Sequence, residues 1–113
     1  MTENVTIDLN QRIFARLNVL EEDIAKFCQK WKIVEFGVFG SVLTDDFRID
    51  SDIDVLVTFD SQFRRKLSDR LEMQDQIEAL FKRSVDLVQK SLLNNPYSRA
   101  EILQSYQVIY VRK

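Results

Sequence analysis

Apolar positions recur along the chain with a helical period in some stretches and as short extended runs in others. Steps of three or four residues from Leu9 to Trp31 predict the apolar face of one long first helix. The members of that face are Leu9, Ile13, Leu17, Leu20, Ile24, Phe27 and Trp31. Similar spacing from about Phe63 to Phe81 predicts a second helix through Leu67, Leu71, Ile77 and Leu80. Asn95 and Pro96 form an N-cap and N1 pair for a short helix that ends near Gln104.

Four short stretches rich in Val, Ile and aromatic residues predict β-strands. They are "KIVEFGVFG" (32–40), "IDVLVTF" (53–59), "SVDLVQ" (84–89) and "YQVIYV" (106–111). The resulting order, α-β-β-α-β-α-β, predicts an α/β (α+β two-layer) fold, in which helices pack on a small mixed sheet of about four strands. A chain of 113 residues with 2 Gly and 1 Pro leaves little room for linkers. Residues 1–113 are therefore expected to form a single domain.

Composition and charge narrow the classes of function. The chain has no histidine, which excludes His-based triads and His–Cys zinc sites, so any catalysis falls to carboxylates, hydroxyls and a hard metal. A formal net charge of -2 argues against direct nucleic-acid binding. The polar, acidic start is no signal peptide, and no apolar run reaches the roughly 20 residues of a membrane span. A lone cysteine, Cys28, fits packing rather than nucleophilic chemistry and suits the reducing cytoplasm.

Three aspartates are candidates for a metal site. Asp52 and Asp54 open a predicted strand, and a period of two directs both carboxylates to one face while Ile53 points to the other. Asp86 occupies a corresponding place in a different predicted strand, so it falls beside the pair if the two strands are neighbours in register. Alone, an Asp-x-Asp pair is most often a turn or capping feature. Three carboxylates brought together would need cations among them, and oxygen ligands favour Mg²⁺ or Mn²⁺.

Gly40 and Ser41 supply the other half of such a site. A glycine at a strand end lets the backbone approach a ligand closely, and Ser41 is expected to cap the following turn. The free N–H groups of that turn could hold a phosphate. Together with the aspartates, this arrangement suits phosphoryl or nucleotidyl transfer, because two metals would clamp the attacking and leaving oxygens.

The pattern Gly40–Ser41, ten residues, then Asp52-x-Asp54 resembles the signature of the polymerase-β-like nucleotidyltransferase superfamily. The likeness to its minimal (MNT) members covers most of the chain and includes "RIDSDIDVLV", "VDLV" and "NPYSRAEIL…VIYV". The resemblance implies the fold of that superfamily, and it implies that Asp52, Asp54 and Asp86 are the catalytic metal ligands. It also implies two Mg²⁺ ions, ATP as substrate and triphosphate contacts from Gly40 and Ser41.

The same resemblance implies a partner. Minimal nucleotidyltransferases are commonly antitoxins of HEPN-domain ribonuclease toxins, and the antitoxin transfers AMP from ATP to a tyrosine hydroxyl of the toxin. The predicted function is therefore protein AMPylation within a hetero-complex. A chain this short has no residues for the second domain with which larger members of the superfamily wall their cleft. We therefore expect another protein to complete the acceptor site.

The chain also departs from the family pattern just after Gly-Ser. Family members often carry an arginine and a further glycine there, whereas this chain has Val42, Thr44 and Asp45, with Arg48 still placed to bind the nucleotide. Fewer cations and more carboxylates weaken triphosphate binding. A catalytically weak or inactive antitoxin that neutralises its toxin by binding alone is therefore the alternative. Transfer to a small molecule such as an aminoglycoside is a third possibility.

Two remaining features favour structural roles. The basic stretches 64–66 and 82–83 are interpreted as solvated helix surface, because acidic residues interleave nearby. The aromatic residues Phe36, Phe39, Phe59 and Tyr110 are expected in the core rather than against an adenine ring.

Overall fold

A computed structural model describes residues 5–64, 66–93 and 96–112 as an α+β fold with one four-stranded mixed sheet. The predicted fold class is confirmed, and the four strands fall within about one residue of the predicted stretches. The elements in chain order are α1 (Val5–Leu17), α2 (Glu21–Trp31), β1 (Ile33–Phe39), η2 (Gly40–Leu43), β2 (Ile53–Phe59), α3 (Leu67–Phe81), β3 (Val85–Gln89), η3 (Lys90–Leu92), α4 (Pro96–Gln104) and β4 (Gln107–Val111). Of these, η2 and η3 are short 3-10 turns.

The sheet has the strand order β3-β2-β1-β4. Strand β1 runs antiparallel to both β2 and β4, whereas β2 and β3 run parallel. Parallel strands begin at the same edge of a sheet, so the starts of β2 and β3 lie side by side. Asp54 is the direct register partner of Asp86 there, so the condition under which Asp86 falls beside the Asp52–Asp54 pair is met.

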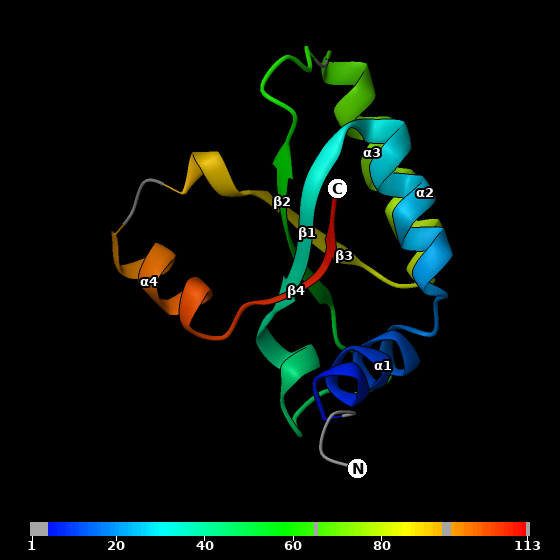
Figure 1. Cartoon of the computed structure of the whole chain (residues 1–113), viewed down its shortest axis with the longest axis vertical. Coiled ribbons are helices and arrows are strands. Elements are labelled where there is room, and N and C mark those ends of the chain that lie inside the picture. Colours follow the sequence, from blue (N-terminus) through cyan, green and yellow to red (C-terminus); the bar gives the residue numbers. More distant parts are fainter. Residues whose placement is uncertain (1–4, 65, 94–95, 113) are drawn as a thin grey trace.

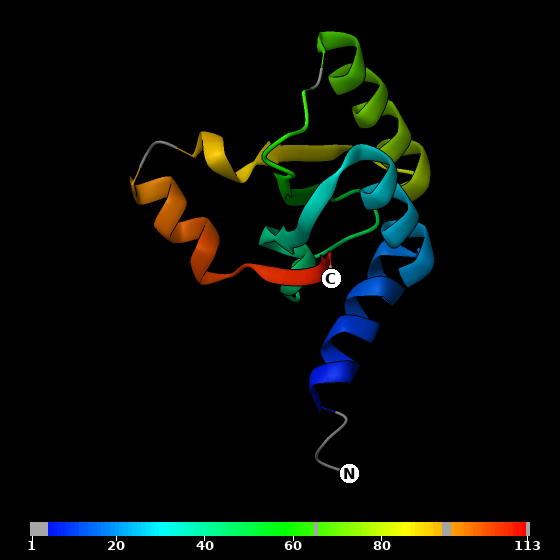
Figure 2. The ribbon, with the colours of Figure 1, turned by 45° about the horizontal axis from the view of Figure 1, so that its top comes forward.

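Helices α2 and α3 cover one face of the sheet, while α4 and η3 lie on its other side (Figures 1 and 2). The core lies between the sheet and α2 and α3. The Phe36 ring of β1 meets Phe27 of α2 at 6.3 Å and Phe81 of α3 at 6.5 Å between ring centroids, both edge to face. One central aromatic side chain therefore contacts both covering helices. Phe39, Phe59 and Tyr110 are only half-buried.

The prediction of one long first helix is wrong, because α1 ends at Leu17 and α2 begins at Glu21. Asn18 has a left-handed φ of 57° at the break, a conformation that asparagine tolerates better than most residues. Leu20 precedes α2 and is exposed. The apolar spacing continues across the break because both helices turn their apolar faces to the same core. An acidic first turn of α2, Glu21–Asp23, marks the second start in the sequence.

The second predicted helix begins too early. Helix α3 starts at Leu67, and Phe63 lies before it, with its ring 5.6 Å from that of Phe59. Leu67 and Leu71 are exposed, whereas the buried residues of α3 are Met73, Ile77 and Phe81. Leu67 and Leu71 continue the apolar spacing although they face solvent, so the spacing predicts a helix that begins too early. The third predicted helix agrees with α4.

Cys28 is fully buried in the core cluster, and burial raises the pKa of its thiol above the ordinary value. A thiol that is hard to ionise is a poor nucleophile, which fits the predicted packing role. Within the described ranges, no helix is long and apolar enough to cross a membrane.

Candidate functional site

The three predicted aspartates lie at one end of the sheet. Asp54 and Asp86 are paired residues on β2 and β3, and Asp52 comes directly before β2. Ile53 and Val55 flank Asp54 and are completely buried on the helix-covered face. Because side chains alternate along a strand, the Asp54 carboxylate lies on the other, less covered face. Asp52 and Asp86 are exposed, and Asp54 is half-buried.

The Gly40 turn lies directly against Asp54. Gly40 has a φ of +77°, which favours glycine, and a Cβ at this position would collide with Asp54 Oδ2. The glycine therefore brings the backbone of η2 beside the carboxylate, as the predicted pairing of these two motifs requires. The predicted capping role of Ser41 is wrong, since Phe39 occupies the N-cap of η2 and no side chain caps it. Thr44 closes the turn instead, because its N–H and its hydroxyl both donate to the Ser41 carbonyl, each at 2.9 Å.

The electrostatics of Asp54 show that the three carboxylates affect one another. Burial is the largest cause that raises the pKa of Asp54 above its ordinary value, followed by the negative charges of Asp86 and then Asp52. In the part of the chain that the structure describes, none of the three side chains forms an ion pair. Among the described residues, the carboxylates at this end of the sheet are therefore not neutralised by an ion pair.

The candidate ligand groups at this end are of the type that a hard cation prefers. All three are carboxylates, and Mg²⁺ and Mn²⁺ prefer oxygen ligands. Yet no three acidic, Cys or His side chains among the described residues are gathered closely enough to hold a metal ion as they stand. Metal binding by Asp52, Asp54 and Asp86 thus remains a prediction.

Arg48 was predicted to bind the nucleotide, and the structure places it in the loop that links η2 to β2. Its side chain is exposed, whereas its backbone is well fixed. The Arg48 N–H donates to Ser51 Oγ at 2.9 Å, and its carbonyl accepts from the Ser51 N–H at 3.0 Å. Contact of the guanidinium with a nucleotide therefore stays a prediction.

Two other arginines contact the same loop, and neither was among the predicted site residues. Arg16 of α1 and Arg83, just after α3, donate to loop carbonyls and lie beside the ring of Phe47. The interpretation of 82–83 as solvated helix surface is wrong for Arg83, because α3 ends at Phe81. Lys82 takes the left-handed C-cap with a φ of 58°, which turns Arg83 toward the loop. The apolar helical spacing also ends at Phe81, and this is the sequence signal that could have placed Arg83 outside the helix.

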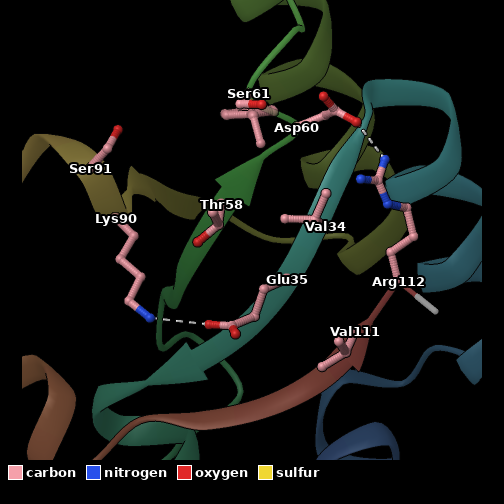
Figure 3. A pocket seen from close by; sticks show the side chains of 10 residues that line it. Val34, Glu35, Thr58, Asp60, Ser61, Lys90, Ser91, Val111 and Arg112 are labelled. Carbon is pink, nitrogen blue, oxygen red and sulfur yellow. Dashed lines mark hydrogen bonds and ion pairs between the residues drawn. The ribbon is translucent and has the colours of Figure 1, made fainter.

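A hollow of about 750 Å³ lies at the far end of β2, away from the aspartates. From Asp54 to Thr58, which lines it, is four residues along the strand, or about 13 Å. Figure 3 shows two ion pairs on its walls, Lys90 with Glu35 at 3.3 Å and Arg112 with Asp60 at 2.7 Å. The hollow and the aspartates are therefore two distinct regions.

Comparison with known proteins identifies the class. Residues 20–109 match the model of the nucleotidyltransferase domain family. The chain is 34% identical over 83 residues to the protein adenylyltransferase MntA of Thermococcus cleftensis, covering 74% of this chain and 79% of that protein. It is also 32% identical to the solved structure of a candidate minimal nucleotidyltransferase, with a TM-score of 0.62 over 77% of this chain and 86% of the other.

A more distant likeness concerns the fold alone. The chain resembles one chain of a complex between a tri-AMPylated Shewanella oneidensis HEPN toxin and an MNT antitoxin. The identity is 19% and the TM-score 0.55, over 81% of this chain and 70% of the other. The match to the family model and the two likenesses above 30% identity show that the chain belongs to the minimal nucleotidyltransferase (MNT) family of nucleotidyltransferase-domain enzymes.

Proposed function

We propose that the protein is an antitoxin that transfers AMP from Mg-ATP to a tyrosine hydroxyl of a partner HEPN toxin in the cytoplasm, and so neutralises it. The observation that carries this proposal is the register pairing of Asp54 with Asp86, with the Gly40 turn packed against Asp54. That geometry joins the two motifs of a nucleotidyl-transfer site. The AMPylated toxin in the distant complex and the name of the MntA relative support the choice of acceptor and nucleotide.

In the proposed reaction, the tyrosine oxygen forms a bond to the α-phosphorus of ATP. The bond from that phosphorus to the bridging oxygen of the β-phosphate breaks, and pyrophosphate leaves with the electron pair. Asp86 lies exposed beside Asp54, where it can accept the hydroxyl proton directly or through water. In this proposal the N–H groups of the Gly40–Ser41 turn hold the triphosphate.

Asp52, Asp54 and Asp86 would hold the divalent ions. Such ions neutralise charge on the phosphates and polarise the attacked phosphorus. Their binding would also offset the like-charge repulsion that raises the pKa of Asp54. In this proposal the unneutralised carboxylates are the feature that selects a cationic partner.

The test is intact mass spectrometry of the toxin that is co-encoded or co-purified with this chain, after incubation with Mg-ATP. We expect mass increments of one or more AMP units on the toxin. The Asp52→Ala/Asp54→Ala variant should add none, while Asp75→Asn, which changes an exposed aspartate on α3, should behave as wild type.

Two results would contradict the proposal. If wild-type protein adds no mass but still forms a stable complex, the protein neutralises its toxin by binding alone. If the double variant adds mass as well as wild type does, the aspartates are not the reacting site.

A further inference from the structure

Phe47 lies in the loop 44–52, between η2 and β2, and two arginines from distant parts of the chain contact its ring. The Arg16 guanidinium of α1 is 5.8 Å from the ring centroid, and the Arg83 guanidinium is 4.7 Å from it. Both distances are within the range of an attractive cation–π contact. The aromatic side chain of the loop is thus held by elements that lie outside the loop.

Each arginine also binds carbonyls at one end of this loop. Arg16 Nη1 donates to the carbonyls of Val42 at 2.8 Å and Thr44 at 2.5 Å, where the chain leaves the Gly40–Ser41 turn. Arg83 Nη1 donates to the Arg48 carbonyl at 3.2 Å and to the Ser51 carbonyl at 3.0 Å, just before Asp52. The two guanidinium groups therefore fix both ends of the connection between the turn and the aspartates.

Ser84, the residue after Arg83, forms a further hydrogen bond to the chain within the candidate site. The Ile53 N–H donates to the Ser84 carbonyl at 3.0 Å, and Ile53 lies between Asp52 and Asp54. The Arg83–Ser84 segment also leads directly into β3, which carries Asp86. One short segment therefore fixes the start of β2 while it positions the third aspartate.

We propose that Arg16 and Arg83, acting through Phe47 and the loop backbone, are positioning residues that set the placement of the Gly40–Ser41 turn relative to Asp52 and Asp54. The inference rests on the proposed function, because this placement matters for a ligand that bridges the two motifs, such as Mg-ATP. A misplacement of such groups by about 1 Å can cost on the order of 10²-fold in rate. Neither arginine needs to contact the nucleotide.

The substitutions Arg83→Lys and Arg16→Lys test this role with the charge retained. A lysine keeps the charge but lacks the planar fork that binds carbonyls while lying against a ring. The matched control is Arg12→Lys, which changes an exposed arginine one turn earlier on α1. Three quantities are compared with wild type: the Kd of Mg-ATP by calorimetry, the hydrogen–deuterium exchange of loop amides 45–51, and the Tm.

We expect Kd to rise about tenfold or more in each variant, and the loop amides to exchange faster, with Tm near that of wild type. Phe47→Leu keeps an apolar side chain without the ring, and it should reproduce both effects even if a lysine variant folds poorly. The Arg12→Lys control should change neither quantity.

Different failures are distinguishable. Faster loop exchange with an unchanged Kd would overturn the positioning role and leave the proposed function intact. A higher Kd with unchanged loop exchange would contradict an effect transmitted through the loop, since the arginine would then act on the nucleotide directly. Wild-type protein that binds no Mg-ATP would overturn the proposed function itself, and this inference with it.

Discussion

Acidic side chains lie near both ends of β2, but they are paired with cations at one end and lie beside one another at the other. At the hollow end, Glu35 pairs with Lys90 and Asp60 pairs with Arg112 (Figure 3). At the other end, Asp54 lies beside Asp86 and Asp52, and none of the three is in an ion pair within the described residues. The pKa values follow the same division, because that of Asp60 is lowered and that of Asp54 is raised.

Under the proposed function, this contrast separates charges that stabilise the fold from charges that take part in the reaction. A carboxylate with a cation and backbone donors stabilises the fold in its charged form, as Asp60 does. A group of carboxylates without such partners destabilises the free protein, and a site of this kind is a candidate for binding cations. The difference suggests that the hollow end is structural and that the aspartate end is the site of chemistry.

The largest effect is expected from Asp54→Asn. Losing this carboxylate should lower AMP transfer on the order of 10³-fold, because a charged group that acts on the reacting phosphate is removed. The Tm of the free protein should not fall, because a half-buried carboxylate under like-charge repulsion is removed. Transfer assays and thermal melts of the same preparation check both statements. Asp60→Asn is the control and should keep transfer; an equal loss in both variants would contradict the division between the two ends.

The two glycines of the chain offer the next comparison, one inside β1 and one directly after it. Gly40→Ala forces a Cβ into Asp54 Oδ2 at a positive φ, and the left-handed conformation alone costs about 1–2 kcal/mol. We expect lower stability together with loss of transfer. Gly37→Ala instead drives a Cβ into the ring of Tyr106, so it should lower stability while transfer per folded molecule persists.

Urea unfolding and transfer assays measure the two glycine variants. Adding Tyr106→Ala should restore part of the stability of Gly37→Ala, because the colliding ring is removed, and it should do nothing for Gly40→Ala. Transfer lost equally in both glycine variants would contradict a specific role for the contact between Gly40 and Asp54.

The sequence predicted the strands well because each is a short apolar run with few competing interpretations. The predicted strand 53–59 has its observed bounds, whereas the pairing of Asp54 with Asp86 was expected only if their two strands are neighbours, which the structure shows. The helices were predicted less well, because period alone cannot show where a chain bends. Asn18 breaks the first helix while the apolar stripe continues on either side of it.

The site was predicted only where its residues are close in the sequence or share a strand register. Gly40 and Asp54 could be linked by motif, but their contact depends on a backbone conformation that the sequence does not display. Arg16, Phe47 and Arg83 come from three separate elements, so their meeting depends on how α1 and α3 pack. Such contacts depend on tertiary structure, which no local pattern encodes.

A smaller effect is expected from Tyr106→Phe at the hollow end. The Tyr106 hydroxyl donates to Glu35 Oε2 at 2.9 Å, and the Lys90 ammonium lies 5.7 Å from the ring. Removing a hydrogen bond to a charged, half-buried group costs about 1–2 kcal/mol of unfolding free energy. Transfer and the Kd of Mg-ATP should match wild type. Urea unfolding gives the first quantity, and a marked loss of transfer would place Tyr106 in the functional site.

The smallest effect concerns the dependence of stability on pH at Asp60. The Gln62 N–H, which donates at 2.9 Å, and then Arg112 hold the pKa of this carboxyl below its ordinary value. The contribution of the charged Asp60 carboxylate to the free energy of unfolding is therefore fully present above the unfolded pKa of about 4. It is lost as pH falls through the folded pKa. Asp60→Asn should be less stable than wild type near neutral pH, and the difference should vanish in acid.

Urea unfolding of wild type and Asp60→Asn across this pH range measures that difference, with Asp75→Asn on α3 as the control. The pH dependence of stability has the opposite sign at Asp54, because a raised pKa means that the folded state binds the proton more tightly than the unfolded state does. Asp54→Asn should therefore gain stability relative to wild type as pH rises, whereas Asp60→Asn should lose it. If the stability of both variants relative to wild type changes in the same direction with pH, the carboxylates at the two ends of β2 are not in electrostatically different environments.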